Sequence, residues 1–313
     1  MDLLATVNAA NPTISKRRIA ASLARIAYAE GRVRVASKDL SDCECLVACT
    51  LGLFAINRAG LVRRLLYGFF HGIRRYDDHL LIFEIGDRPR LPNAYGRVLR
   101  IPVEGQRLGK PAILVQNLDN RCHQLALFDG LIHVIDTAHQ QILRFTPDGG
   151  IVDAIQPFPF TRGVSPESDY LHINSIARIG NRIALMLHNG AEERPSELAW
   201  FDPEWALLER HSLPGLGCHD IVADGDGTLW HCGSMDGELI NSRGERYKIS
   251  DRMTRGLAIT PEGFAVGAST FGAREVRDNF TGSVLFLDRE TNLVADVLVP
   301  AAPMDLIALT PRG

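Results

Sequence analysis

Residues 122–135 read CHQLALFDGLIHVI. Asp129 and Gly130 form a typical tight-turn pair, and the apolar runs on either side are as long as ordinary β-strands. Turn residues between two such runs predict a β-hairpin. A small residue and a polar residue, Cys122 and His123, open this hairpin.

The same arrangement recurs along the chain, and six copies can be aligned by their opening pair of residues. The opening pairs are Phe70-His71, Cys122-His123, Leu171-His172, Cys218-His219, Thr254-Arg255 and Met304-Asp305. The polar positions follow one another at intervals of 36 to 52 residues. A repeat of this length is typical of one four-stranded propeller blade. We therefore predict an all-β fold, a six-bladed β-propeller.

The sixth copy ends with the chain after a single strand, while three strands without a copy of their own stand near the N-terminus. These strands are expected at residues 44–49, 52–57 and 61–67. Pairing them with residues 306–309 would complete the sixth blade and close the ring, which removes the open edges of a repeated sheet. The predicted propeller therefore spans residues 41–313 as one domain.

Residues 1–40 lie outside the repeat and are interpreted as an N-terminal helical extension. Ile19, Leu23 and Ile26 recur at helical spacing with arginines between them, which predicts a short amphipathic helix from Ser15 to Ala29. A basic amphipathic helix can also bind membranes. Because the apolar stripe is short, packing on the propeller or on a partner subunit is favoured.

The polar residues of the six opening pairs are expected to form a ring. In a propeller the first strand of each blade lies along the central axis, so equivalent residues of all blades converge there. The predicted ring consists of His71, His123, His172, His219, Arg255 and Asp305. In the third copy the hairpin is longer, and Asn174 competes with His172 for the axial position.

Four imidazoles at equivalent positions of successive repeats suggest a metal site. Imidazoles brought together repel when protonated, and a divalent cation relieves this by holding them neutral. All-nitrogen ligation favours one transition metal ion, Fe, Cu or Zn, with His71, His123, His172 and His219 as ligands. A purely structural ring is the alternative.

Two further ring residues, Arg255 and Asp305, are the candidate catalytic groups. Asp305 could orient a ligand, act as a base or itself bind the metal, and Arg255 could hold a carboxylate or oxyanion. The alternative is an Arg255–Asp305 ion pair that only neutralises the channel. Outside the ring, His188 and His231 end second strands and are candidates for supporting roles beside the site.

The composition excludes several classes of partner. The chain has 313 residues, of which 46% are hydrophobic and 23% charged, and its net charge of −3 provides no basic field for nucleic acid or anionic membranes. No apolar run approaches the length of a membrane helix, and the N-terminal one is too short for a signal peptide. A cytoplasmic protein with a small-molecule substrate is predicted. If the protein is an oligomer, we expect the N-terminal helix to form the contact.

The repeat over residues 41–313 resembles six-bladed propellers of the NHL and gluconolactonase/strictosidine-synthase type. Metal-binding lactonases of that group use axial carboxylates and Asn, whereas this chain has histidines. The ring is similar to that of the peptidyl-hydroxyglycine lyases, with three axial His on zinc, and of the seven-bladed carotenoid cleavage oxygenases, with four axial His on iron. By this resemblance too, His71, His123, His172 and His219 would be metal ligands.

Three functions remain open at this point. The first is a metalloenzyme with a mononuclear His-ligated site, acting as an oxygenase, an oxidase or a lyase on a small molecule. The second is a metal-independent propeller lactonase or cyclase that uses His as acid and base and Arg255 to hold an anion. The third is a non-enzymatic scaffold, since one fold can host all three.

Overall fold

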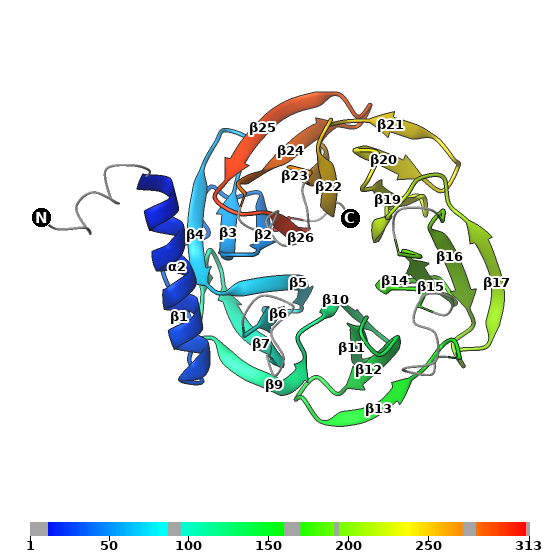
Figure 1. Ribbon diagram of the computed structural model, residues 1–313, viewed down its shortest axis with the longest axis horizontal. Coiled ribbons are helices and arrows are strands. Elements are labelled where there is room, and N and C mark those ends of the chain that lie inside the picture. Colours follow the sequence, from blue (N-terminus) through cyan, green and yellow to red (C-terminus); the bar gives the residue numbers. More distant parts are fainter. Residues whose placement is uncertain (1–11, 87–94, 160–169, 191–193, 272–279, 311–313) are drawn as a thin grey trace, which may run out of the picture.

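The computed structural model describes residues 12–86, 95–159, 170–190, 194–271 and 280–310. Six antiparallel sheets surround a central axis, which confirms the predicted six-bladed propeller (Figure 1). Blade 1 contains β5 (Phe69–Tyr76), β6 (His79–Ile85), β7 (Tyr95–Glu104), β8 (Arg107–Leu108) and β9 (Ala112–Asp119). Blade 2 contains β10 (Cys122–Phe128), β11 (Leu131–Asp136), β12 (Gln141–Phe145) and β13 (Ile151–Ile155).

The next three blades follow in chain order, each starting at the axis and ending at the rim. Blade 3 contains β14 (Ile173–Ile179), β15 (Arg182–Leu187), β16 (Glu197–Phe201) and β17 (Leu207–Ser212). Blade 4 contains β18 (His219–Ala223), β19 (Leu229–Gly233), β20 (Glu238–Asn241) and β21 (Arg246–Lys248). Blade 5 contains β22 (Met253–Thr260), β23 (Gly263–Ser269), β24 (Gly282–Asp288) and β25 (Leu293–Val299).

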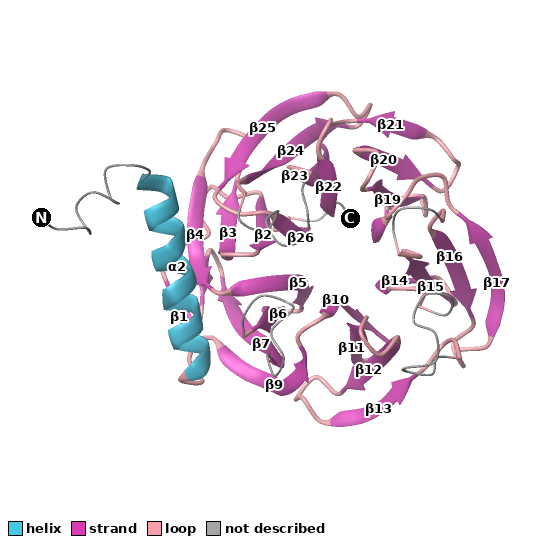
Figure 2. Ribbon diagram, in the orientation of Figure 1, coloured by secondary structure: helices cyan, strands magenta, loops and turns pink. Residues whose placement is uncertain are grey.

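Blade 6 joins the two ends of the chain, as predicted (Figure 2). Its strands in sheet order are β26 (Pro303–Ala308), β2 (Cys45–Cys49), β3 (Gly52–Ile56), β4 (Val62–Tyr67) and β1 (Arg34–Val35). The axial strand β26 is antiparallel to β2, with Leu306 opposite Val47. The ring is thus closed by hydrogen bonds between segments far apart in sequence.

The inner strands of each blade are more buried than its outermost strand. All residues of β2 and β3 are buried, because inner strands have a neighbouring blade on both faces. This explains their continuous apolar runs, which lack the alternation of a half-exposed strand. The outermost strand β17, in contrast, is exposed at every position.

Helix α2 (Pro12–Ala29) lies outside blade 6, alongside β4 and β1 (Figure 1). It begins three residues before the predicted Ser15, since proline fits the first turn of a helix. The expected apolar face is wrong: Ile19 and Ile26 are more than half exposed, and the small residues Ala20, Ala24 and Ala27 are buried instead. Small side chains let the helix approach the sheet closely. In the described part of the chain no helix is long and apolar enough to cross a membrane.

A buried ion pair anchors the C-terminal end of α2 on blade 1. Arg97 Nε donates to Glu84 Oε2 (2.7 Å), and both side chains are almost fully buried. Arg97 also donates to the carbonyl of Arg32 (2.7 Å), and its guanidinium lies 4.3 Å from the centre of the Tyr28 ring. The hydroxyl of Tyr28 donates to the carbonyl of Tyr95. The helix therefore bridges blades 6 and 1 where the ring closes.

Replacing Arg97 with methionine is expected to lower the free energy of unfolding by about 3 kcal/mol, because a buried carboxylate loses its partner. Burial already raises the pKa of Glu84 to about 7, against the opposing effect of Arg97. A carboxyl whose folded pKa is raised loses stability as pH rises through that value. Since the Arg97→Met variant would raise the pKa further, we expect its deficit to be larger at pH 8 than at pH 5.

Chemical denaturation of wild type and variant at both pH values measures this effect. Arg243→Met is the matched control, because its ion pair with Asp226 is solvent-exposed and is expected to contribute less than about 1 kcal/mol. Equal losses in Arg97→Met and Arg243→Met would show that the buried pair does not anchor the helix.

Candidate functional site

The first strands of the six blades, β5, β10, β14, β18, β22 and β26, surround the axis (Figure 1). In each of them the register of pairing with the second strand of the blade shifts by one residue. Such a bulge adds one residue to the strand and re-aims its side chains. Two successive residues of a strand can then face the axis, where strict alternation would allow one.

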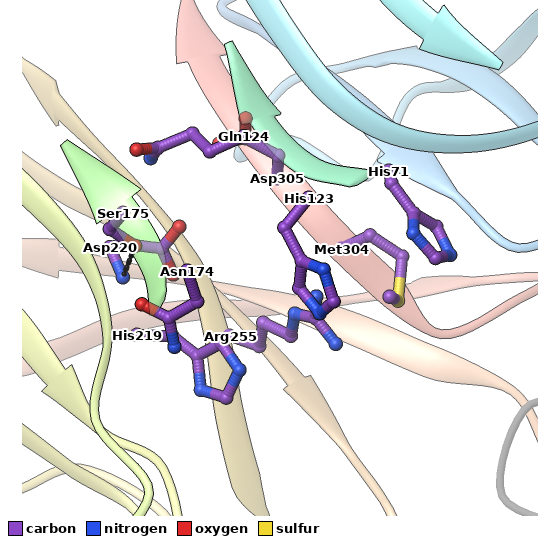
Figure 3. Close-up of a pocket in the computed structure, with 10 residues that line it drawn as sticks. All are labelled: His71, His123, Gln124, Asn174, Ser175, His219, Asp220, Arg255, Met304 and Asp305. Atoms are coloured by element: carbon purple, nitrogen blue, oxygen red, sulfur yellow. Dashed lines mark hydrogen bonds between the residues drawn. The ribbon is translucent and has the colours of Figure 1, made fainter. Parts of the chain in front are cut away.

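These strands enclose an axial cavity with an empty volume of about 200 Å³ (Figure 3). The first set of lining residues contains one from each blade: His71, His123, Asn174, His219, Arg255 and Met304. The second set follows four of these directly in the sequence and consists of Gln124, Ser175, Asp220 and Asp305. In blades 1 and 5 the following residue is a glycine, Gly72 or Gly256, which has no side chain to contribute.

Five of the six residues predicted from the repeat line this cavity: His71, His123, His219, Arg255 and Asp305. Asp305 belongs to the second set, because Met304 is the residue that blade 6 contributes to the first set. The sixth predicted residue, His172, does not line the cavity, and its blade contributes Asn174 instead.

The displacement of His172 has a local cause. Its backbone is left-handed, with a φ of 50°, and β14 begins only at the next residue. Gln140 of blade 2 holds this turn, since its Oε1 accepts hydrogen bonds from the N–H groups of Leu171 and His172. The longer turn carries Asn174 to the axis.

Five imidazoles nevertheless form a continuous arc beside the axis. The ring centres of His71 and His123 are 5.8 Å apart, and those of His123 and His172 are 5.4 Å apart. His188 stacks on His172 at 4.5 Å and contacts His219 at 4.8 Å. His188, expected beside the site from its strand end, is thus part of this arc, although neither His188 nor His231 lines the cavity.

His123 is held in one tautomer by its neighbours. Its Nδ1 lies 2.7 Å from the carbonyl oxygen of Arg121 and 3.0 Å from Thr137 Oγ1. Thr137 donates its own proton to the carbonyl of Ile173 (2.7 Å), so it accepts from the imidazole. A carbonyl can only accept, and Nδ1 therefore carries the proton. Nε2 is left as the basic nitrogen.

His219 is held by the same kind of contacts in blade 4. Its Nδ1 lies 2.8 Å from the carbonyl oxygen of Gly217 and 3.0 Å from Ser234 Oγ. In both blades the carbonyl belongs to the residue two positions earlier, and the hydroxyl comes from the end of the second strand. His219 therefore also keeps Nε2 unprotonated.

Both imidazoles remain neutral at neutral pH. Burial lowers the pKa of His123 and of His219 well below the usual 6.5, and the charge of Arg255 lowers both further. Neighbouring histidines act in the same direction. The cavity thus combines two basic nitrogens with one fixed cation.

The second set of lining residues ties blades 2, 3, 4 and 6 to the blade that follows each of them. Its side chains accept from backbone N–H groups across the blade interfaces: Gln124 from Ile176 (2.9 Å), Ser175 from Asp220 (2.8 Å), Asp220 from Gly256 (2.7 Å) and Asp305 from Ile73 (3.0 Å). The carboxylate of Asp305 also pairs with Arg74 Nη1 (2.7 Å). Asp305 therefore has a cationic partner in blade 1, separate from the Arg255 pairing considered in the sequence.

Two buried polar atoms at the cavity lack a hydrogen-bond partner among the described residues. They are Gln124 Nε2, a donor, and Asn174 Oδ1, an acceptor, on side chains that are 3% and 1% exposed. Leaving such groups unpaired costs about 1–3 kcal/mol each. A ligand or water in the cavity that can both accept and donate would satisfy them.

The described residues contain no group of three or more His, Cys, Asp or Glu side chains placed to hold a metal ion. The guanidinium of Arg255 also brings a positive charge to the same cavity as His123 and His219, which opposes a second cation. Because His172 does not line the cavity with His71, His123 and His219, the lining does not fit the predicted four-histidine set. The Fe, Cu or Zn site stays a prediction.

Sequence reasoning did not identify Gln124, Ser175 and Asp220. Alternation along a regular strand would turn the residue after each ring position away from the axis, and the bulge reverses this. One signal was available: two copies have glycine at this place, Gly72 and Gly256, where a side chain would collide with the next blade, with the backbone at His123 or with the side chain of Leu306.

No protein-family model and no curated protein matches the chain. A chain of a nidogen/laminin complex matches its structure with a TM-score of 0.62 at 11% identity, covering 86% of this chain and 99% of that one. The fold is shared. A gluconolactonase-like protein aligns with a TM-score of 0.54 at 12% identity, covering 87% and 89% of the two chains. A 6-phosphogluconolactonase-like protein from Bacteroides uniformis aligns with a TM-score of 0.52 at 11% identity, covering 83% of this chain and 84% of that one.

Proposed function

We propose that this propeller is an enzyme that hydrolyses a small lactone or ester without a metal ion. The observation that supports this most is the pairing of two neutral imidazoles, the partly buried His123 and the buried His219, with the cation of Arg255 in one cavity. Ester hydrolysis needs a base to activate water and a positive group to stabilise the oxyanion. The lactonase-like propellers reported above share the fold, and we extend their named reaction class to this chain as part of the proposal.

Arg255 and His123 reach the cavity from opposite sides of the ring of blades. They come from blades 5 and 2, which stand opposite each other in a ring of six, and Arg255 extends beneath the His123 ring (Figure 3). His219 lies beside Arg255 in the adjacent blade. We assign the base to His123 and the stabilisation of the oxyanion to Arg255.

The proposed reaction begins when His123 Nε2 removes a proton from water as the water oxygen bonds to the acyl carbon. The carbonyl electron pair moves onto its oxygen, and the oxyanion is held by Arg255. When the carbonyl re-forms, the acyl C–O bond breaks and the leaving oxygen takes up a proton. A hydroxy acid results from a lactone, and His123 returns its proton to the solvent.

The size of the cavity limits the substrate. Its empty volume of about 200 Å³ includes space that is open to solvent, so the lining residues enclose only part of it. Small lactones and esters are therefore the appropriate first probes, such as δ-valerolactone and p-nitrophenyl acetate.

A His-ligated metalloenzyme, an oxygenase, oxidase or lyase, is the second candidate. It is favoured by the Nδ1 hydrogen bonds of His123 and His219 to carbonyl oxygens, since metal-binding histidines are commonly oriented in this way. A bound Fe, Cu or Zn would supply Lewis-acid or redox chemistry there. Metal analysis of the purified protein separates the two candidates: stoichiometric metal that is required for turnover would contradict the first.

The pH dependence of hydrolysis tests the assignment of a histidine base. Because the folded pKa of His123 lies well below 6.5, the base is already unprotonated there, and the acid limb of kcat/KM for δ-valerolactone should lie below pH 6.5. A pH-stat profile from pH 4 to 8 measures this. An acid limb centred at or above 6.5 would contradict a base in this environment.

A further inference from the structure

The two carboxyl groups of the cavity lie in different electrostatic surroundings. Asp305 Oδ2 accepts from Ile73 N–H and from Arg74 Nη1, and its Oδ1 accepts from Leu306 N–H (2.9 Å). Three donors, one of them a cation, stabilise the charged form of Asp305. Asp305 is therefore the better-paired carboxyl group of the two.

Asp220 has much less support for a negative charge. Its side chain is 5% exposed, and its Oδ2 accepts one hydrogen bond, from Gly256 N–H at 2.7 Å. Burial and then the charge of Asp305 raise the pKa of Asp220 to about 7.

The backbone at Asp220 is held in an uncommon conformation. Its φ is 62°, and the equivalent residue of blade 5 is Gly256, with a φ of 84°. Left-handed backbone at a residue other than glycine persists where the surroundings fix it, and such positions cluster at functional sites. Here Ser175 Oγ accepts from the N–H of Asp220 (2.8 Å) and holds this backbone at the cavity wall.

We propose that Asp220 is the proton donor for the leaving oxygen in the proposed hydrolysis, an inference that rests on that function. The group lines the same cavity as His123 and Arg255. As the acyl C–O bond breaks, its electron pair stays on the leaving oxygen, which takes the proton of the Asp220 carboxyl. Asp220 is left as a carboxylate and regains a proton from the solvent, balancing the one released by His123.

The Asp220→Asn variant tests the donor, because an amide oxygen can still accept from Gly256 N–H but the side chain has no acidic proton. An alkoxide leaves poorly without protonation, whereas p-nitrophenolate leaves readily as an anion. We therefore expect kcat for δ-valerolactone to fall by about 10²-fold or more, with p-nitrophenyl acetate changed less than about tenfold. Asp226→Asn, in an exposed turn of the same blade, is the control and should leave both rates unchanged.

The possible results distinguish this inference from the function on which it rests. Equal losses on the two probes, or no loss, in an otherwise active enzyme would overturn the role of Asp220 and leave the base in place. Absence of wild-type hydrolysis would overturn both the function and this catalytic role. Infrared difference spectra between pH 5.5 and 8.5 then test the protonated carboxyl separately: a C=O band that Asp220→Asn removes supports it, and no such band contradicts it.

Discussion

The Arg255→Met variant should hydrolyse δ-valerolactone with a kcat/KM lowered by about 10²–10³-fold, the loss seen when an oxyanion donor is removed. The same variant should raise the pKa of His123, since the charge of Arg255 is one of the causes that lower it. Its acid limb should therefore move to higher pH. Steady-state rates and a pH profile measure both effects.

Arg255→Lys is the matched control for charge. A lysine keeps the positive charge near His123 but cannot present the planar pair of donors of a guanidinium. We expect it to retain the wild-type position of the acid limb with an intermediate rate. Titration of His123 by NMR gives the pKa change without a substrate, and an unchanged pKa in Arg255→Met would show that the two groups are not coupled.

The His123→Gln variant should lose about 10²–10⁴ in kcat, the usual contribution of a positioned general base. The side-chain amide keeps much of the volume of the imidazole and a hydrogen-bonding group, but it cannot accept a proton from water. KM should change little, because binding to Arg255 remains.

Two other histidine variants serve as controls for this result. His219→Gln removes the imidazole that has the same tautomer and a similarly lowered pKa but lies beside Arg255. His211→Gln changes an exposed residue of β17 and should leave kcat unchanged. A loss confined to His219→Gln would contradict the assignment of the base to His123.

The fold could be predicted from the sequence because the strands and turns of each blade follow one another directly in the chain. Turn pairs such as Asp129-Gly130 separate strand-length apolar runs, and the interval between them equals one blade. The closing of blade 6 also followed, since Leu306 and Val47 belong to incomplete sets of strands that only each other can complete.

The site was accessible only where the repeat is regular. His123 and His219 occupy the same place in copies of similar length, and both reach the cavity. His172 does not, because the left-handed turn that Gln140 stabilises adds residues before β14. Asp220 was missed since alternation assigns successive residues to opposite faces, and the bulge that breaks this rule is marked in the sequence only by the glycines of two other copies, Gly72 and Gly256.

Hydrolysis by metal-free enzyme tests the central claim most directly. Wild-type protein would be treated with a strong chelator, analysed for Fe, Cu and Zn, and assayed with δ-valerolactone at pH 7. We predict full activity when only trace metal remains, because the base and the cation of the site, His123 and Arg255, belong to the chain itself. Activity that disappears with the metal and returns on adding Fe, Cu or Zn would contradict the account.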